Sequence, residues 1–143
     1  MKGIVAIFVI LGLVIASEAG TDCQEAREKE KQSKFPLRMI PDCDEDGNYL
    51  PLQCYEHSKS CMCVKPDGSV VTPPDLKIRA CKCILESKNA FQPHLIGNYV
   101  PQCERDGTYS RTQCHGSTGY CWCVDEKGVR LSESVPPGQD IRC

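Results

Sequence analysis

The first hydrophobic feature of the chain is an apolar run from Ile4 to Ala16, interrupted only by glycine. A basic start, Met1-Lys2, precedes this run, and Ser17-Glu18-Ala19 follows it with small residues where signal peptidase requires them. The alternative, a membrane anchor, needs about 20 apolar residues to cross the hydrocarbon layer. The pattern therefore predicts a signal peptide over residues 1–19, followed by a soluble, secreted protein with no membrane partner.

The next segment, residues 22–32, is rich in Glu, Lys, Arg and Ala, which are good helix formers. Thr21 before it and Gln24 three residues later fit a capping box. Phe35-Pro36 ends any continuation, because the residue before a proline is pushed out of the helical region. The pattern predicts a short, mostly solvated helix over residues 22–32 and a weaker helical segment over residues 84–88.

Beyond residue 40 the apolar positions come in short stretches between turn signals. Asp46-Gly47 and Asp106-Gly107 mark tight turns, in which glycine supplies a positive φ. Asp67-Gly68 and Lys127-Gly128 turn the chain again. Short antiparallel strands are predicted over residues 49–54, 61–64, 70–71, 108–114, 121–124 and 129–131.

The cysteines repeat with a fixed spacing, and internal repeats decide the architecture. They lie at positions 23, 43, 54, 61, 63 and 81, and again at 83, 103, 114, 121, 123 and 143. The successive gaps are 20, 11, 7, 2 and 18 in the first set and 20, 11, 7, 2 and 20 in the second. The sequence predicts two tandem domains, residues 20–82 and 83–143, joined by little more than Lys82.

Twelve cysteines after a secretory signal indicate an oxidised protein held together by disulfides. A domain of about 60 residues buries too little apolar surface to be safely stable alone, so the bridges contribute much of the stability, about 3 kcal/mol each. Spacing leaves many connectivities open and argues only against a bridge from Cys61 to Cys63 on one strand. The expected fold class is small disulfide-rich α+β, each domain having a short helix, a small antiparallel sheet and long loops.

Little in the sequence points to catalysis or to a cofactor. His57, His94 and His115 have no cysteine pairs at zinc-site spacing, because the close pairs are Cys-x-Cys. A disulfide sulfur is not a thiolate, which argues against a Cys–His nucleophile. The net charge of −2 includes no basic patch for nucleic acid. We expect no enzyme activity, no metal, no cofactor and no nucleic-acid partner.

A set of residues around the cysteines of each domain carries a family resemblance. In the second domain they are Gln113-Cys114, Cys121-Trp122-Cys123-Val124 and, upstream, Cys103 to Tyr109. The first domain matches from Cys43 to Cys54. The pattern resembles the thyroglobulin type-1 domain, and the resemblance covers nearly all of the chain after the signal peptide.

The resemblance implies a disulfide pairing and a function. Family members pair their cysteines consecutively, and secreted proteins similar to tandem type-1 domains include thyropins, whose three loops form a wedge in the active-site cleft of papain-like cysteine proteases. Similar two-domain chains occur among arachnid venom components. The implied partner is a papain-like cysteine protease of the cathepsin L type, bound by a monomer of this protein. The implied bridges are Cys23–Cys43, Cys54–Cys61, Cys63–Cys81, Cys83–Cys103, Cys114–Cys121 and Cys123–Cys143.

Two departures from the family pattern fall in the first domain. Met62 replaces the tryptophan that Trp122 preserves in the second domain, so a flexible thioether stands where the family has an indole. Residues 56–60 replace the Gly-rich second loop that residues 115–120 keep. We therefore expect the second domain to be the stronger inhibitor. Trp122 is expected to be a core residue beside a disulfide rather than a binding anchor, because alternation along the strand places it opposite the bridged sulfurs.

Three loops of each domain are the candidate binding elements. Loop one comprises residues 33–40 and 89–100, loop two residues 56–60 and 116–120, and loop three residues 73–78 and 134–139. Disulfides that rigidify these loops reduce the entropy lost on binding. The alternative is that the loops are simple connectors. The side chains expected to contact a protease are Phe35, Leu37, Met39, His57, Ser58, Phe91, Leu95, Ser117, Thr118, Gly119 and Tyr120.

Two other functions stay open at this point. Many type-1 domains have no known inhibitory activity, so the chain could be a secreted interaction module or venom component that binds a receptor, a channel or a growth factor. One domain could instead inhibit an aspartic protease. An inhibition panel separates these possibilities.

Overall fold

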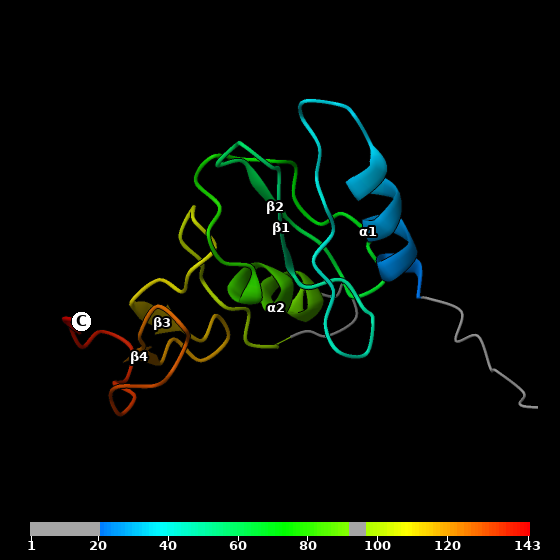
Figure 1. Ribbon diagram of the computed structural model, residues 1–143. Coiled ribbons are helices and arrows are strands. Elements are labelled where there is room, and N and C mark those ends of the chain that lie inside the picture. Colours follow the sequence, from blue (N-terminus) through cyan, green and yellow to red (C-terminus); the bar gives the residue numbers. More distant parts are fainter. Residues whose placement is uncertain (1–20, 92–96) are drawn as a thin grey trace, which may run out of the picture.

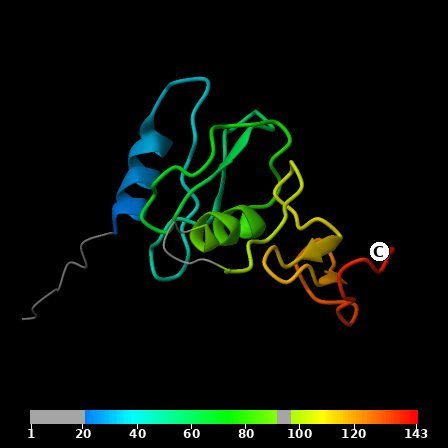
Figure 2. The same ribbon diagram turned by 180° about the vertical axis from the view of Figure 1, so that it is seen from behind.

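The computed structural model describes residues 21–91 and 97–143. The predicted signal peptide and Leu95 lie outside these residues, and both stay predictions. The described chain folds as two similar units in tandem, each with one helix and one two-stranded sheet (Figures 1 and 2). No helix in this part of the chain is long and apolar enough to cross a membrane.

Helix α1, Asp22–Gln32, begins at the predicted cap. The Thr21 hydroxyl accepts a hydrogen bond from the Gln24 amide at 3.4 Å, and the Gln24 side-chain oxygen accepts one from the Thr21 amide at 3.2 Å. This reciprocal pair satisfies two of the amides that a helix start leaves unpaired. Cys23 is the buried residue of the helix, and its bridge to Cys43 attaches the helix to the domain. A disulfide, rather than an apolar face, therefore docks this solvated helix.

Each sheet is one antiparallel hairpin with three-residue strands. β1, Leu52–Cys54, pairs with β2, Cys61–Cys63, and β3, Thr112–Cys114, pairs with β4, Cys121–Cys123. The residue between the two cysteines of the second strand faces a glutamine on the first strand. Met62 faces Gln53 in one domain, and Trp122 faces Gln113 in the other.

The strands are shorter than the sequence predicts. Tyr49 and Tyr109, expected inside strands, each form a single bridge to the cysteine six residues before them. Val64 and Val70 likewise form one isolated bridge. Each of these bridges closes a tight turn, and the backbone beyond it does not continue as a paired strand.

All twelve cysteines are paired, and consecutively, as the family resemblance implies. Cys54–Cys61 and Cys114–Cys121 join residues directly opposite in the hairpins, with Cα–Cα distances of 4.0 and 4.1 Å. Each of these two bridges closes loop two at its base. The other four bridges connect helices, sheets and tails across 5.5 to 6.0 Å.

A buried glutamine holds the centre of each domain. The Gln53 side-chain oxygen accepts a hydrogen bond from the Asp42 amide at 2.9 Å, and its amide group donates to the carbonyls of Asp42 and Leu50 at 2.8 and 2.7 Å. Gln113 makes the three equivalent contacts in the second domain at 2.7 to 2.9 Å. Both side chains are almost fully buried. Because an unpaired buried amide is costly, the clamp fixes the path of the chain into β1 and β3.

The two domains are joined through a helix. α2 spans Lys82–Ala90 and begins directly after Cys81, so Lys82, expected to be a linker, is the first residue of the helix. The helix is also longer than the predicted segment 84–88. Its N-terminus has no side-chain cap, so local sequence signals do not mark its start, and packing on both sides stabilises it instead.

Helix α2 contributes to both domains. Ile84 and Leu85 pack against the first domain's buried cluster around Ile78, while Cys83 is part of the second domain's buried cluster. In both views α2 lies between the β1–β2 and β3–β4 hairpins (Figures 1 and 2). Cutting the chain at the predicted boundary would therefore expose apolar surface of the first domain.

A second contact between the domains surrounds the Asp106-Gly107 turn. The amides of Arg79 and Ala80 donate to the Asp106 carbonyl at 2.9 and 3.0 Å, and the Arg79 guanidinium pairs with the carboxylates of Asp106 and Glu126. Hydrogen bonds from Thr108 and Arg79 lower the pKa of Asp106 to about 2. Together with α2, this contact fixes the two domains relative to one another.

Candidate functional site

Loops two and three lie side by side in both domains. In the first domain the Cys61 amide donates to the Asp75 carbonyl at 3.0 Å, and the Asp75 amide donates back at 2.9 Å. In the second domain Cys121 and Val135 exchange the same pair of bonds at 3.1 and 2.8 Å. The cysteine that closes loop two thus also holds the start of loop three.

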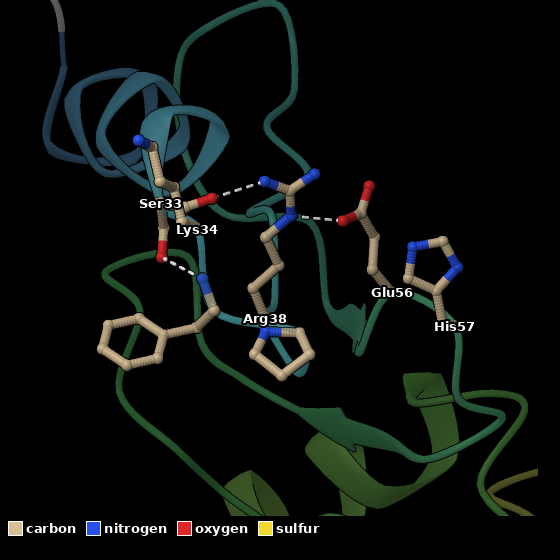
Figure 3. Close-up of a pocket in the computed structure, with 7 residues that line it drawn as sticks. Ser33, Lys34, Arg38, Glu56 and His57 are labelled. Atoms are coloured by element: carbon tan, nitrogen blue, oxygen red, sulfur yellow. Dashed lines mark hydrogen bonds and ion pairs between the residues drawn. The ribbon is translucent and has the colours of Figure 1, made fainter.

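In the first domain an ion pair ties loop one to loop two. The Arg38 guanidinium contacts the Glu56 carboxylate and donates to the Ser33 carbonyl at 2.7 Å, and the Glu56 amide donates to the Arg38 carbonyl at 2.8 Å. The hydrogen bond from Arg38 lowers the pKa of Glu56. Figure 3 shows Arg38 between Ser33 and Glu56, with His57 beside Glu56. The three loops of this domain therefore form one continuous edge.

A cavity of about 380 Å³ opens where loops one and two of the first domain meet (Figure 3). Its walls combine an apolar pair, Phe35 and Pro36, with charged and polar groups, and the Arg38–Glu56 ion pair forms part of its lining. The full lining is Ser33, Lys34, Phe35, Pro36, Arg38, Glu56 and His57.

The second domain braces its edge with stacked rings. Tyr99 of loop one lies 5.1 Å from Trp122, between ring centroids, and the Arg130 guanidinium lies 5.0 Å from the Trp122 ring centre. Arg130 also donates to the Ser134 hydroxyl at the start of loop three. The Tyr99 hydroxyl donates to the buried Gln113, and burial raises the pKa of Tyr99. This stack links loops one and three through the central strand.

Trp122 is half-buried and packs against the buried cluster of Cys83, Tyr109 and Val124. The expectation of a core residue thus agrees with its packing, although one face of the ring is covered by Arg130 rather than by the interior. Trp122 is only half-buried because the residue opposite it on the hairpin, Gln113, occupies the centre of the domain.

Loop two has a different backbone in each domain. In the first, the Ser58 amide donates to the Tyr55 carbonyl at 3.3 Å, and His57 has a φ of 60°, an uncommon value for a residue with a side chain. In the second, the Gly119 amide donates to the His115 carbonyl, four residues earlier, at 2.7 Å, and the positive φ falls on Gly119. The Gly-rich sequence therefore gives the second domain a less strained loop.

The apolar residues predicted to contact a partner divide into two groups. Phe35, Leu37 and Phe91 are 77, 63 and 76 % exposed, and Tyr120 is 45 % exposed. Met39 is half-buried, so it supports loop one rather than projecting from it. Leu76 in loop three was not among the predicted residues, but it is 72 % exposed and lies between Asp75 and Lys77 in a Pro-rich loop.

The polar residues predicted for loop two face solvent or bond within the loop. His57, Ser117 and Thr118 are exposed, and Ser58 is half-buried with its hydroxyl accepting from the Ser60 amide at 3.0 Å. The Ser117 hydroxyl lies 3.0 Å from His115 Nδ1 and donates to the Gly97 carbonyl of loop one at 3.4 Å. In the second domain, too, loops one and two are therefore in contact.

The described residues include no group of three His, Cys, Asp or Glu side chains close enough to hold a metal ion. The loop edges instead present exposed apolar side chains on a backbone fixed by disulfides and hydrogen bonds. Such a surface is suited to bind another protein, because little conformational freedom is left to lose.

Comparison with known proteins agrees with this geometry. The model of the thyroglobulin type-1 repeat matches residues 19–83 and again residues 78–143. The chain is 46 % identical over 127 residues to U20-hexatoxin-Hi1a of Hadronyche infensa, covering 87 % of this chain and 88 % of that protein. It is 33 % identical over 123 residues to U24-ctenitoxin-Pn1a of Phoneutria nigriventer, covering 86 % and 96 %.

Equistatin of Actinia equina is 35 % identical over 109 residues, which cover 71 % of this chain and 45 % of equistatin. Both repeats match the family model, all twelve cysteines pair in its consecutive order, and each unit has the same helix and hairpin. The chain belongs to the thyroglobulin type-1 repeat family and contains two consecutive copies of the repeat.

Proposed function

We propose that the protein is a secreted, non-covalent, competitive inhibitor of papain-like cysteine proteases, with cathepsin L as the type of target. The observation that carries the proposal is the continuous three-loop edge in each domain. A disulfide closes loop two at its base, paired backbone bonds join it to loop three, and apolar side chains of the edge, Phe35 above all, are exposed. A rigid edge of this kind fits the cleft of a protease as the wedge of related inhibitors does.

The proposal includes secretion. The predicted signal peptide over residues 1–19, the oxidised cysteines and two relatives named as toxins all support release from the cell. No step of the proposed inhibition is chemical: the loops occupy the cleft, and the protein is not an enzyme.

The second domain is proposed to be the stronger inhibitor, because its Gly-rich loop two adopts its turn without a strained side-chain residue. Variants of the whole chain test this order, since α2 contributes to both domains. Gly119→Val should weaken inhibition more than His57→Val. A larger loss of inhibition for His57→Val would instead identify the first domain as the stronger inhibitor.

The direct experiment titrates papain and a cathepsin L with the oxidised full-length protein at a fixed concentration of a fluorogenic substrate. We expect reversible inhibition that more substrate relieves. No inhibition of either enzyme at micromolar concentration would refute the proposal. A cathepsin D-like enzyme in the same panel tests whether one domain acts on an aspartic protease instead.

The second candidate is a non-inhibitory venom component that binds a receptor, a channel or a growth factor. The toxin names of two relatives that match most of the chain favour it. Capture of such a partner by the immobilised full-length protein, together with an inactive protease panel, would support this function over inhibition.

A further inference from the structure

The loops of the two domains differ completely in charge. Loops one, two and three of the second domain, residues 89–100, 116–120 and 134–139, contain no Asp, Glu, Lys or Arg. The corresponding loops of the first domain contain four cations and two carboxylates, in a chain whose net charge is −2. Its edge is therefore positive although the protein is not. These charged residues are Lys34, Arg38, Glu56, Lys59, Asp75 and Lys77.

The excess positive charge lies on exposed lysines. Arg38 and Glu56 neutralise each other across the loops. Lys34 lines the cavity beside Phe35, while Lys59 lies in loop two, two residues after His57. Both lysines are exposed, and neither ammonium forms an ion pair within residues 21–91 and 97–143.

We propose that the first-domain edge docks on a protein cleft bordered by carboxylates, with Phe35 as the apolar contact and Lys34 and Lys59 facing the acidic rim. This inference rests on the proposed function and specifies the chemistry of the partner. Exposed charges at the rim of an interface accelerate association and select against partners of like charge. The uncharged second-domain edge carries no such selection, so the two domains accept different sets of targets.

The test measures association of the full-length protein with papain and cathepsin L by stopped-flow inhibition, from about 0.01 M to about 1 M salt, over which the Debye length falls from about 30 Å to about 3 Å. The variant is Lys34→Glu/Lys59→Glu. The matched control is Lys65→Glu/Lys127→Glu, which changes the net charge equally at exposed lysines in turns that follow the central strands, away from loop two.

At low salt, the double variant should associate about tenfold more slowly than wild type with the enzyme that has the more acidic cleft rim. At high salt, the association rates of the two proteins should become equal. The association rate of the control should stay close to that of wild type, and any kinetic phase due to binding by the second domain should be insensitive to salt.

Equal association rates for wild type and Lys34→Glu/Lys59→Glu at low salt would overturn the inference while leaving inhibition intact. No inhibition by wild type would overturn the proposed function, and this inference with it. Loss of heparin retention in the double variant, without a change in protease association, would assign the lysines to a polyanion and also overturn it.

Discussion

The two domains share one disulfide framework but hold their loops together by different side-chain interactions, an ion pair in the first and stacked rings in the second. The first uses the Arg38–Glu56 ion pair; at the corresponding positions the second has Asn98 and Gly116, which cannot form one. The second stacks Tyr99, Trp122 and Arg130; the first has Met39, Met62 and Val70 there. The same disulfide framework therefore accommodates two different sets of side-chain contacts along its loop edge.

The domains also differ in what covers the Asp-Gly turn before the sheet. In the first domain Thr21 lies over Gly47 and donates its hydroxyl to the Gly47 carbonyl at 2.7 Å. In the second domain the backbone of Ala80, from the first domain, lies over Gly107. A flexible side chain can move away from a substitution, whereas the backbone at the domain junction cannot.

The largest effect is expected for Gly107→Ala. A Cβ there would lie 1.7 Å from the Ala80 carbonyl oxygen, and the φ of 87° is itself unfavourable for alanine. We expect a loss of roughly 3–5 kcal/mol in the free energy of unfolding, measured by denaturant titration of the oxidised protein. Gly47→Ala, against a side chain, should cost less. Gly138→Ala, with a φ of 85° but open space, should cost about 1 kcal/mol. Equal losses for Gly107→Ala and Gly138→Ala would show that the junction is not packed as described.

A smaller loss is expected when the buried glutamines are truncated. Gln53→Ala leaves the Asp42 amide and the Leu50 carbonyl unpaired, whereas the Asp42 carbonyl keeps its bond from the Leu50 amide, so the loss should be about 2–3 kcal/mol. Gln113→Ala should cost about 1 kcal/mol more, because the Tyr99 hydroxyl also loses its acceptor. Chemical denaturation of both variants gives the difference. A larger loss for Gln53→Ala would contradict the link between the clamp and the aromatic stack.

The contact of Asp106 at the domain junction should lose its charge at a lower pH than an ordinary carboxylate does. The pKa of Asp106 is lowered from 3.8 to about 2 by Thr108 and Arg79, so its charge stabilises the folded state at higher pH, and this contribution is lost as the pH falls from 3.8 to about 2. Asp106→Asn should lower the melting temperature by about 2–4 °C at neutral pH, and the difference from wild type should vanish near pH 2. Asp46→Asn, in the equivalent turn of the first domain, is the control. A pH-independent difference for Asp106→Asn would refute the role of its charge.

The smallest effect on stability is expected for Arg38→Ala and Glu56→Gln. The ion pair is partly exposed and screened by solvent, so its loss should change the free energy of unfolding only slightly. Loop one should nevertheless become more mobile, and trypsin should cleave after Lys34 faster in Glu56→Gln than in wild type. Unchanged cleavage would mean that the backbone bonds alone hold the edge.

Part of this architecture could be predicted from the sequence. The cap at Thr21 identified α1, and the cysteine spacing with the family resemblance identified both domains and all six bridges. The sequence does not reveal that α2 begins at Lys82, because its start has no capping side chain and its stability comes from contacts with two cores. The ion pair between Arg38 and Glu56 was equally hidden, since the two residues meet only after the disulfides have brought the loops together.

Whether the loop edges bind a protease is tested by comparing loop-edge variants of the full-length protein in one competitive inhibition assay against papain-like proteases. Phe35→Asp/Tyr120→Asp places a charge on an exposed apolar residue of each edge, and Val129→Asp/Leu131→Asp does the same at residues 57 and 65 % exposed outside the loops. Wild type and Val129→Asp/Leu131→Asp should inhibit tightly and reversibly, whereas inhibition by Phe35→Asp/Tyr120→Asp should be about 30-fold or more weaker. Equal inhibition by all three proteins, or none by wild type, would contradict the claim that these edges bind a protease.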